Sequence, residues 1–463
     1  MADINNVFTE LGNAQRLVAR HKDEMRFCPQ AGKFMVAIDG RWRWDDAGLV
    51  TAWQAELARG MWARVPEFPE DRRASFIKFC IESERAGKIA AAVTLAQTDQ
   101  SIVIDANQID ASDFLFGVEN GVVDLRSGEL RPYSPGDLIT KVSPVVYDPA
   151  ASCPRWEEFL GRIMSGNSRM IEYIQRIAGL CATGVSTVQE FYIFYGSGAN
   201  GKSTLLDTLF YILGNHAVDA NESLLIVRRG GEEHPTELAD LAGKRLVVAS
   251  ETESGGKLRI QLIKRMTGDA RMKGRFMRQD FFTFDRKFKT ILVTNHRPRI
   301  EEDTDAVWRR IRLIPFDVII PKEERDGELL SKLKNDAAGI LNWIIQGCVS
   351  WQLDGMRPPE EVLVATQDYR TDADAISDFF STNTIIADFA RASRIEIWGS
   401  YQSWAKANAG KDGLDRAGFY ERVRRIDGIK DSEWRVDGKP VRGFTGIGLS
   451  VSTTTSQEIS NLY

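Results

Sequence analysis

The sequence predicts an α/β fold with a largely parallel central sheet, flanked by a mainly helical N-terminal part and a small C-terminal part. Three apolar runs of strand length predict the sheet, at 191–195, 245–250 and 289–294. Segments of helical or hairpin character separate these runs, and strands that alternate with helices favour parallel pairing. The first run is rich in aromatic residues, ends at Gly196 and precedes a helix predicted from Lys202 to about Leu213.

The remaining segments follow from the same periodicities. Helical spacing is found at 53–61, 73–92, 156–183 and 328–351, and extended segments are predicted at 101–104 and 121–125. Residues 147–154 are typical of a linker, because proline and serine disfavour a helix there. The region from about 360 to 450 predicts a small helical domain that ends in a hairpin with its turn at Asp437-Gly438, and 450–463 is expected to fray.

Composition excludes several classes of protein. The chain has 463 residues, which suggests two to four domains. Because its net charge is −5, nucleic acid could be bound only by a local basic patch or by a channel formed on assembly. No apolar run reaches about 18 residues, so no membrane span is expected and we place the protein in the cytoplasm, or in the host cytoplasm if it is viral.

Cysteine and histidine usage argues against a zinc site. The five cysteines are scattered without CxxC spacing, and there are only four histidines. Buried free thiols in a reducing compartment are the simplest interpretation.

The segment from Gly196 to Ser203 fits the phosphate-binding pattern GxxxxGK[ST] at every fixed position. It also lies between a strand and a helix, as the pattern requires, which disfavours a glycine-rich turn that binds nothing. Backbone N–H groups of such a loop cradle phosphate oxygens, Lys202 would reach the β and γ phosphates, and the Ser203 hydroxyl would bind Mg²⁺. The residues assigned to ATP binding are Gly196, Ser197, Gly198, Ala199, Asn200, Gly201, Lys202, Ser203 and Thr204.

The run at 245–250 ends in carboxylates, Glu251 and Glu253. An acid at this strand end would emerge beside the phosphate loop, where it can hold Mg²⁺ through water or polarise the attacking water. Glu251 is the better candidate for catalysis and for the metal, because it follows the strand directly, and Glu253 is the reserve. The alternative is a solvated acidic loop.

Two further motifs follow in the sequence. The run at 289–294 ends at Asn295, whose amide could hydrogen-bond the γ-phosphate or orient water, although an asparagine before Arg-Pro can also be simple turn chemistry. Arg309 and Arg310 come next, and one of them could reach a neighbouring subunit's γ-phosphate in a ring. We favour Arg310 over Arg309 from the sequence.

Residues 257–278 form a basic segment in an otherwise acidic protein. Its charged residues are Lys257, Arg259, Lys264, Arg265, Arg271, Lys273, Arg275 and Arg278, against the single acid Asp269. Gly268 and Gly274 allow a hairpin there. Such a segment attracts phosphates through Coulomb forces and counterion release, and the alternative is a solvated basic face.

This order of motifs resembles superfamily 3 helicases of the AAA+ class, and more narrowly the phage and plasmid primase-helicases related to the poxvirus primase-helicase. Similar sequence covers nearly the whole chain, and the combination of motifs is more specific than any one of them. The similar segments are Leu11–Leu17, Gly40–Trp44, Val118–Pro135, Tyr147–Leu160, GSGANGKST, LAGKRLVVASETE, LIKRMTGDARMKGR, KTILVTNHRPRI and VWRRIRLIPF.

The resemblance implies a homo-hexameric ring with ATP and Mg²⁺ between subunits and single-stranded or forked DNA in its pore, usually moved 3′ to 5′. Lys273 and Arg275 match the position of a pore hairpin, and Lys264 is a further candidate for DNA contact. The implied domains are an accessory domain at 1–150, a helical collar at 151–185, an AAA+ motor at 186–322, a helical lid at 323–355 and a winged-helix-like domain at 356–463.

Two departures from the family pattern matter. The acidic motif is Glu-Thr-Glu rather than an adjacent acid pair, so the roles of Glu251 and Glu253 stay open. No Asp-x-Asp strand or cysteine set indicates a primase domain, so a separate primase or polymerase is the expected partner.

Three functions compete at this point. The first is the replicative helicase of a phage, plasmid or other mobile element. The second is a ring initiator or loader that binds ATP but unwinds little. The third, a small-molecule kinase, leaves the basic segment unexplained.

Overall fold

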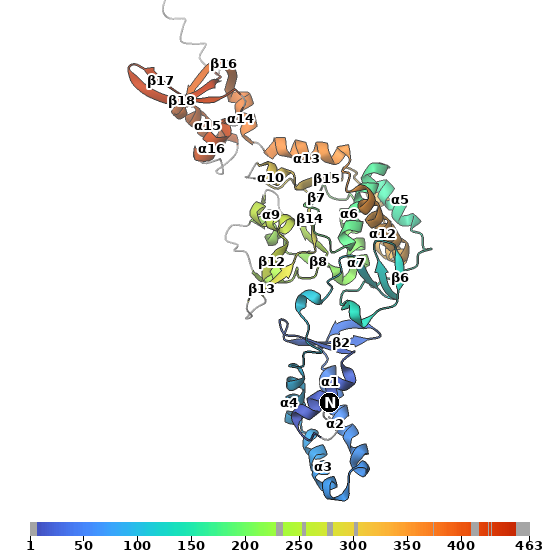
Figure 1. Ribbon diagram of the computed structural model, residues 1–463. Coiled ribbons are helices and arrows are strands. Elements are labelled where there is room, and N and C mark those ends of the chain that lie inside the picture. Colours follow the sequence, from blue (N-terminus) through green and yellow to red (C-terminus); the bar gives the residue numbers. More distant parts are fainter. Residues whose placement is uncertain are drawn as a thin grey trace, which may run out of the picture. The chain divides into compact units, whose positions relative to one another are not determined.

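The computed structural model shows a mixed α/β protein (Figure 1). It describes residues 7–227, 235–251, 256–275, 281–300, 304–373, 375–408, 416–424, 426 and 428–450. The chain divides into two compact units. The first comprises 1–299 and 309–365, and the second comprises 300–308 and 366–463.

The N-terminal part of the first unit consists of a small sheet and four helices. The Thr9 hydroxyl accepts a hydrogen bond from Gly12 N at 3.1 Å and so caps the first helix. The sheet is antiparallel in the order β1-β2-β3, and its inner face packs against helices through Leu17, Val36 and Val50. The elements are α1 (Glu10–His21), β1 (Met25–Cys28), β2 (Lys33–Ile38), β3 (Arg41–Trp44), α2 (Leu49–Gly60), α3 (Glu70–Ser83) and α4 (Ala86–Ala96). The helices predicted at 53–61 and 73–92 are confirmed, the latter with a break between Ser83 and Ala86.

A second small sheet and two helices lead to the central sheet. The extended segment predicted at 121–125 is confirmed as a strand, whereas Val103 in the segment predicted at 101–104 makes only an isolated bridge to Phe27. The helical region predicted at 156–183 is two helices, the second capped by the Asn167 side chain, which accepts from Met170 N at 3.2 Å. The elements are β4 (Leu115–Val118), β5 (Gly121–Asp124), β6 (Glu129–Arg131), α5 (Pro154–Ile163) and α6 (Ser168–Ala182).

The core of the first unit is a five-stranded, fully parallel sheet in the order β15-β7-β14-β10-β8. All three predicted strands are present, and two that were not predicted, β8 and β15, occupy the edges. The strands are β7 (Phe191–Tyr195), β8 (Ala217–Ala220), β10 (Leu246–Ser250), β14 (Lys289–Thr294) and β15 (Ile311–Pro315). The helix predicted after the phosphate loop is α7 (Lys202–Leu213).

Shorter elements join these strands, and two helices complete the unit. β12 lies in the basic segment and pairs antiparallel with β13, which begins just beyond that segment, as expected of a hairpin. The predicted helical region at 328–351 is α11 and α12, and α12 packs against α6. The elements are β9 (Ile226–Val227), α8 (Pro235–Ala239), β11 (Lys257–Leu258), α9 (Ile260–Gly268), β12 (Arg271–Gly274), β13 (Phe282–Asp285), α11 (Leu329–Asn335) and α12 (Ala337–Asp354).

Buried cations anchor the amino-terminal ends of two strands of the central sheet. Arg245 precedes β10 and donates to the carbonyls of Ala182 and Leu115, the latter at 2.8 Å. Lys289, the first residue of β14, donates to the carbonyl of Thr183. Because these backbone acceptors replace water, the charges can be buried, although burial lowers the pKa of Lys289 to about 7. The side chains thus connect two strands to the end of α6 and to the first residue of β4.

The second unit contains a small antiparallel sheet packed against helices. Its sheet order is β16-β18-β17, and the predicted hairpin is β17–β18 with positive φ angles at Asp437 and Gly438, as a two-residue turn requires. Aromatic side chains, among them Phe379, Phe419 and Phe444, form its core. The elements are α10 (Asp305–Trp308), α13 (Glu360–Ala373), which begins in the first unit, α14 (Ala375–Asn383), β16 (Thr384–Ser393), α15 (Arg394–Asn408), α16 (Arg416–Arg424), β17 (Lys430–Val436) and β18 (Lys439–Leu449).

Two sequence-based expectations concern the whole chain. All five cysteines are free and buried, as predicted. No helix among the described residues has the length and apolar character needed to cross a bilayer.

Candidate active site

The phosphate loop has a backbone that only glycine can adopt at two points. Gly196 has φ 154° and Gly201 has φ 85°. A Cβ atom at Gly196 would lie 2.3 Å from the Phe316 carbonyl oxygen, and one at Gly201 would lie 2.5 Å from Ile163 Cγ2. These glycines therefore let the loop pass close to β15 and α5. At Gly198, by contrast, a Cβ would meet nothing within 4 Å, so this part of the loop faces open space.

Asn200 fastens the loop to the end of β15. Its buried amide donates to the carbonyl of Phe316 at 3.0 Å, and the carbonyl of Ala199 accepts from Ile320 N at 2.8 Å. Both bonds join the loop to the chain that follows β15. The loop is thus held in shape by the protein itself, before any phosphate binds.

Lys202 begins α7 and is only 4% exposed. Its Nζ donates to the carbonyl of Gly196 at 2.6 Å and to Oδ1 of Asn200 at 3.1 Å, and lies 3.4 Å from Oδ1 of Asn295. Burial lowers the pKa of Lys202 to about 8, because loss of hydration disfavours the charged ammonium. Ser203 and Thr204 follow in the first turn of α7, and Ser203 is exposed.

Glu251 follows β10 directly, is 7% exposed and lies beside β14, since its N–H donates to the carbonyl of Val293 at 2.8 Å. The hydroxyl of Thr294 donates to Glu251 Oε2 at 2.8 Å. Burial raises the pKa of Glu251, and the hydrogen bonds from Thr294 and from the Gly256 backbone partly oppose this rise. Glu253 lies outside the described residues.

The carboxyl ends of β7, β10 and β14 thus bring the predicted groups to one edge of the sheet. Asn295 follows β14, is exposed, and approaches Lys202, while Gly196 N donates to the carbonyl of Thr294 at 3.4 Å. Sequence reasoning missed Thr294; the available signal was a polar β-branched residue at the strand end, between the apolar run and Asn295.

Some side chains of this site could hold a metal ion that accompanies a triphosphate. Among the described residues, no cluster of three or more histidine, cysteine, aspartate or glutamate side chains could hold a metal ion. Mg²⁺ in phosphate-loop sites needs no such cluster, because nucleotide phosphates and water supply most of its ligands. The exposed Ser203 hydroxyl and the Glu251 carboxylate are the side chains here that fit that role.

The two adjacent arginines have different environments. Arg310 is buried, and its Nε donates to the Thr267 hydroxyl on α9 at 3.1 Å. Its carbonyl accepts from Phe191 N, so it lies at the amino-terminal end of β7, at the opposite edge of the sheet from the phosphate loop. Arg309 is exposed.

The cations of the basic segment differ in exposure and in the groups that they contact. In β12 the side chains alternate, with Arg271 and Lys273 exposed and Met272 buried, and Arg275 is exposed just beyond the strand. Arg271 pairs with Asp285 at 3.1 Å, whereas Arg275 lies 4.8 Å from the centroid of the Phe281 ring. Lys264 is half-buried on α9, and Arg278 lies outside the described residues.

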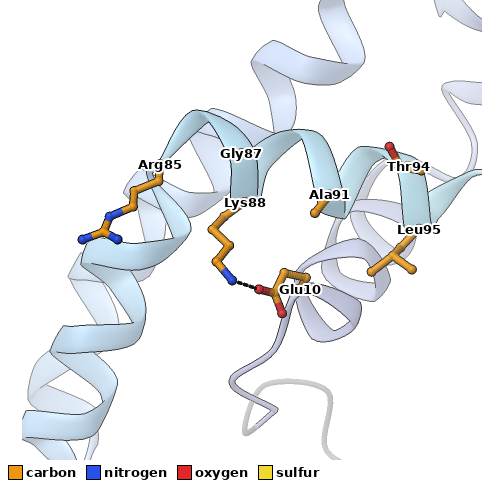
Figure 2. A pocket seen from close by; sticks show the side chains of 7 residues that line it. All are labelled: Glu10, Arg85, Gly87, Lys88, Ala91, Thr94 and Leu95. Carbon is orange, nitrogen blue, oxygen red and sulfur yellow. Dashed lines mark hydrogen bonds and ion pairs between the residues drawn. The ribbon is translucent and has the colours of Figure 1, made fainter.

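The N-terminal part has a hollow of about 760 Å³ between α1 and α4 (Figure 2). Figure 2 shows Lys88 directed at the carboxylate of Glu10, and the two form an ion pair. The rest of the lining is Arg85, Gly87, Ala91, Thr94 and Leu95, and Arg85 pairs with Glu82 at 2.9 Å. Both cations of the hollow are therefore already paired with carboxylates.

Comparison with known proteins decides the family. Residues 14–165 match the family described as "D5 N terminal like", and residues 194–310 match a "Family of unknown function (DUF5906)". An Acanthamoeba polyphaga mimivirus protein named "Putative helicase L207/L206" is 28% identical over 324 residues, which are 65% of this chain and 34% of the relative. "Primase D5" of Fowlpox virus is 28% identical over 151 residues, which are 31% of this chain and 19% of the relative.

The chain is a member of the primase-helicase family. A third viral relative, "Putative helicase 184R" of Invertebrate iridescent virus 6, is 23% identical over 325 residues, 61% of this chain and 33% of the relative. This primase-helicase family member spans about a third of the length of the first two helicase-named relatives, 34% and 33%. The matched region 194–310 contains every described candidate site residue of this primase-helicase family member.

Solved structures share the fold of this primase-helicase family member. The apo structure of the C-terminal region of NrS-1 covers 95% of this chain and 99% of its own, with a TM-score of 0.54 and 12% identity. The A form of the same region gives a TM-score of 0.52 with the same identity and coverage. At this level of identity the similarity concerns the fold alone.

Proposed function

We propose that this chain is an ATP-driven DNA helicase motor that acts in the replication of a phage, plasmid or other mobile element. The observation that carries the proposal is the convergence of Lys202, Glu251 and Asn295 at one edge of a parallel sheet, beside a preformed phosphate loop. The names of the viral relatives support a role in replication. The parallel sheet supports the superfamily 3 AAA+ assignment, and the hairpin and helices of the second unit support a winged-helix-like domain.

Each side chain has a part in the proposed hydrolysis. Backbone N–H groups of the loop hold the phosphates, and Lys202 exchanges its bonds with Gly196 and Asn200 for the β and γ phosphates. Bound Mg²⁺ would neutralise charge on the phosphate oxygens. Glu251 takes the proton of the attacking water, and a pKa raised by burial suits it to that task. Asn295 orients the γ-phosphate, which Lys202 also contacts.

Assembly completes the proposed site. Arg309 and Arg310 lie at the amino-terminal edge of the sheet, far from the loop of the same chain. An arginine there can serve only the nucleotide of a neighbouring copy, which supports a ring, proposed to be a hexamer. The exposed cations of the β12–β13 hairpin would then face single-stranded DNA in the pore. A separate primase or polymerase is the proposed partner.

The decisive experiment measures ATP hydrolysis and strand displacement by the purified chain on forks with a 3′ or a 5′ tail. We expect DNA-stimulated hydrolysis and displacement on the 3′-tailed fork. Hydrolysis without displacement on either fork would favour a ring initiator or loader. Absence of both nucleotide binding and hydrolysis would overturn the proposal.

ATP affinity should weaken as the pH rises above about 8, the pKa to which burial brings Lys202. Bound phosphates favour the charged amine and raise this pKa, so the complex keeps a proton that the free protein loses. Linkage then predicts up to about a tenfold loss of affinity per pH unit above pH 8, until the lysine of the complex also titrates. Fluorescent-nucleotide titrations from pH 7 to pH 10 measure this slope. In Lys202→Arg, whose guanidinium stays charged, the slope should flatten; equal slopes would contradict the assignment.

The basic hairpin should grip the DNA strand. Lys273→Ala with Arg275→Ala should weaken single-strand binding and reduce the slope of log affinity against log salt by roughly 0.7 for each phosphate that the variant no longer neutralises. Unwinding and DNA stimulation should fall, whereas basal ATPase should persist because neither side chain is assigned to the nucleotide. The control, Arg59→Ala with Lys78→Ala, removes the same charge from exposed positions on α2 and α3. If both double variants behave alike, the hairpin has no special role.

A further inference from the structure

Thr294 occupies the point where the three strand ends of the site meet. It is the last residue of β14, is 1% exposed, and lies between the apolar strand and Asn295. Its carbonyl accepts from Gly196 N at 3.4 Å, and its hydroxyl lies 2.8 Å from Glu251 Oε2. One residue therefore touches both the phosphate loop and the carboxylate.

The hydroxyl of Thr294 is held from two sides. It accepts from His296 N at 3.0 Å, which fixes its orientation. It has a single proton to donate, and two acceptors are within reach, Glu251 Oε2 and the carbonyl of His296. Donation to an ionised carboxylate is the stronger of the two bonds. The position of the backbone at 294–296 thus decides whether Glu251 keeps this bond.

We propose that Thr294 is a positioning residue that holds the Glu251 carboxylate toward the attacking water, a role that rests on the proposed ATP hydrolysis. A buried carboxylate on a strand end can rotate about its side-chain bonds, and a fixed donor on the adjacent strand removes that freedom. The backbone of Gly256 limits the other side, since a Cβ there would lie 2.5 Å from Oε1. The carboxylate is thereby confined between β14 and Gly256.

The same residue connects nucleotide contact to the carboxylate. Asn295 follows Thr294 directly, and its Oδ1 lies 3.4 Å from Lys202 Nζ. When Lys202 turns to bound phosphates, Asn295 loses this partner and is released toward the γ-phosphate. Any resulting shift of the backbone at 294–296 moves the Thr294 hydroxyl relative to its two acceptors. Glu251 is then oriented according to whether a γ-phosphate is present.

Thr294→Val tests the role, because valine keeps the shape and removes the hydroxyl. We expect kcat for DNA-stimulated ATP hydrolysis to fall about 10- to 100-fold, with nucleotide affinity close to wild type. Thr294→Ser, which keeps the hydroxyl, should restore the wild-type kcat.

The matched control is Thr290→Val on the same strand. Thr290 is also buried, and its hydroxyl has no hydrogen-bond partner in the part of the chain that the structure describes. Its replacement should leave kcat unchanged. In a Glu251→Gln background, Thr294→Val should lower kcat little further, because the carboxylate that Thr294 positions is absent.

The outcomes separate this role from the proposed function. A wild-type protein without ATP turnover would overturn both. Wild-type turnover with equal kcat values for Thr294→Val and Thr290→Val would overturn the role of Thr294 alone. A loss of thermal stability in Thr294→Val that Thr294→Ser repairs without restoring kcat would also count against it, because the hydroxyl would then serve only the fold.

Discussion

A Lys202→Ala protein is expected to fold and to lose ATP turnover by a factor of about 100 to 1000 or more. The ammonium is the only cation among the described partners of the phosphate loop, through its bonds to Gly196 and Asn200. Alanine removes the charge aimed at the transferring phosphoryl group. Phosphate release, measured with saturating DNA and a series of ATP concentrations, gives kcat and KM separately.

The stability of this variant distinguishes a catalytic from a structural lysine. Burial lowers the pKa of Lys202 to about 8, so at neutral pH the folded state carries a charge that it disfavours relative to the unfolded chain. Removing that charge should leave the melting temperature unchanged or raise it. Lys202→Met, which also fills the side chain's volume, should behave in the same way. Normal turnover by a folded Lys202→Ala protein would contradict the assignment of the site.

The central strands could be predicted from the sequence where both faces of a strand are buried. The predicted ranges of β7 and β14 agree with the structure residue for residue, because both strands are covered on both faces and contain apolar runs, FYIFY in β7 and Ile291–Val293 in β14. β15 was missed because cations precede and interrupt it. Arg312 lies within this edge strand and pairs with Glu190 at 2.9 Å, so a strand position carries a charge that periodicity assigns to the surface.

The sequence predicts those residues of the site that directly follow a buried strand. Glu251 and Asn295 each follow a buried strand, and parallel pairing of β10 with β14 places both at one edge. The partners of each group depend on packing across the sheet. The Thr294–Glu251 bond joins residues from different strands, and a threonine at a strand end usually reflects β-propensity alone.

Buried cations show a second limit of sequence reasoning. Arg245 and Lys289 each stand at the beginning of a predicted strand, where a charge normally marks the transition to solvent. Their acceptors are carbonyls at 115, 182 and 183, which are distant in the sequence and become neighbours only when the sheet meets the end of α6 and the start of β4. Nothing in the local pattern distinguishes such a cation from an exposed one.

Adjacent Arg309 and Arg310 raise the same difficulty, and the structure changes the preference between them. The sequence favoured Arg310 as the arginine that acts on a neighbouring subunit. Arg310 is 9% exposed and is bonded to Thr267 of its own chain, and burial lowers its pKa. Because Arg309 is exposed, we now propose it as the residue that reaches the next subunit's γ-phosphate, with Arg310 fixing α9 to the start of β15.

Arg309→Ala is therefore expected to lower kcat by about 10³- to 10⁵-fold without changing the melting temperature. The strand β15 has five residues, so at roughly 3.3 Å per residue about 16 Å of sheet separates its amino end from the edge with the phosphate loop. An arginine side chain does not span that distance within one chain, so its effect must act between chains. Arg310→Ala should instead lower the melting temperature, because Thr267 and α9 lose a buried partner.

Mixed assemblies test whether the site is shared. Inactive Arg309→Ala subunits mixed with inactive Lys202→Ala subunits should regain ATPase activity, because some interfaces then combine an intact phosphate loop with an intact arginine. Neither variant should recover when mixed only with itself. Recovery with Arg310→Ala but not with Arg309→Ala would return the role to Arg310. If neither arginine variant complements Lys202→Ala, although subunit exchange is shown by labelled chains, the arginines do not complete a site between subunits. The interface would then bind nucleotide through one subunit alone.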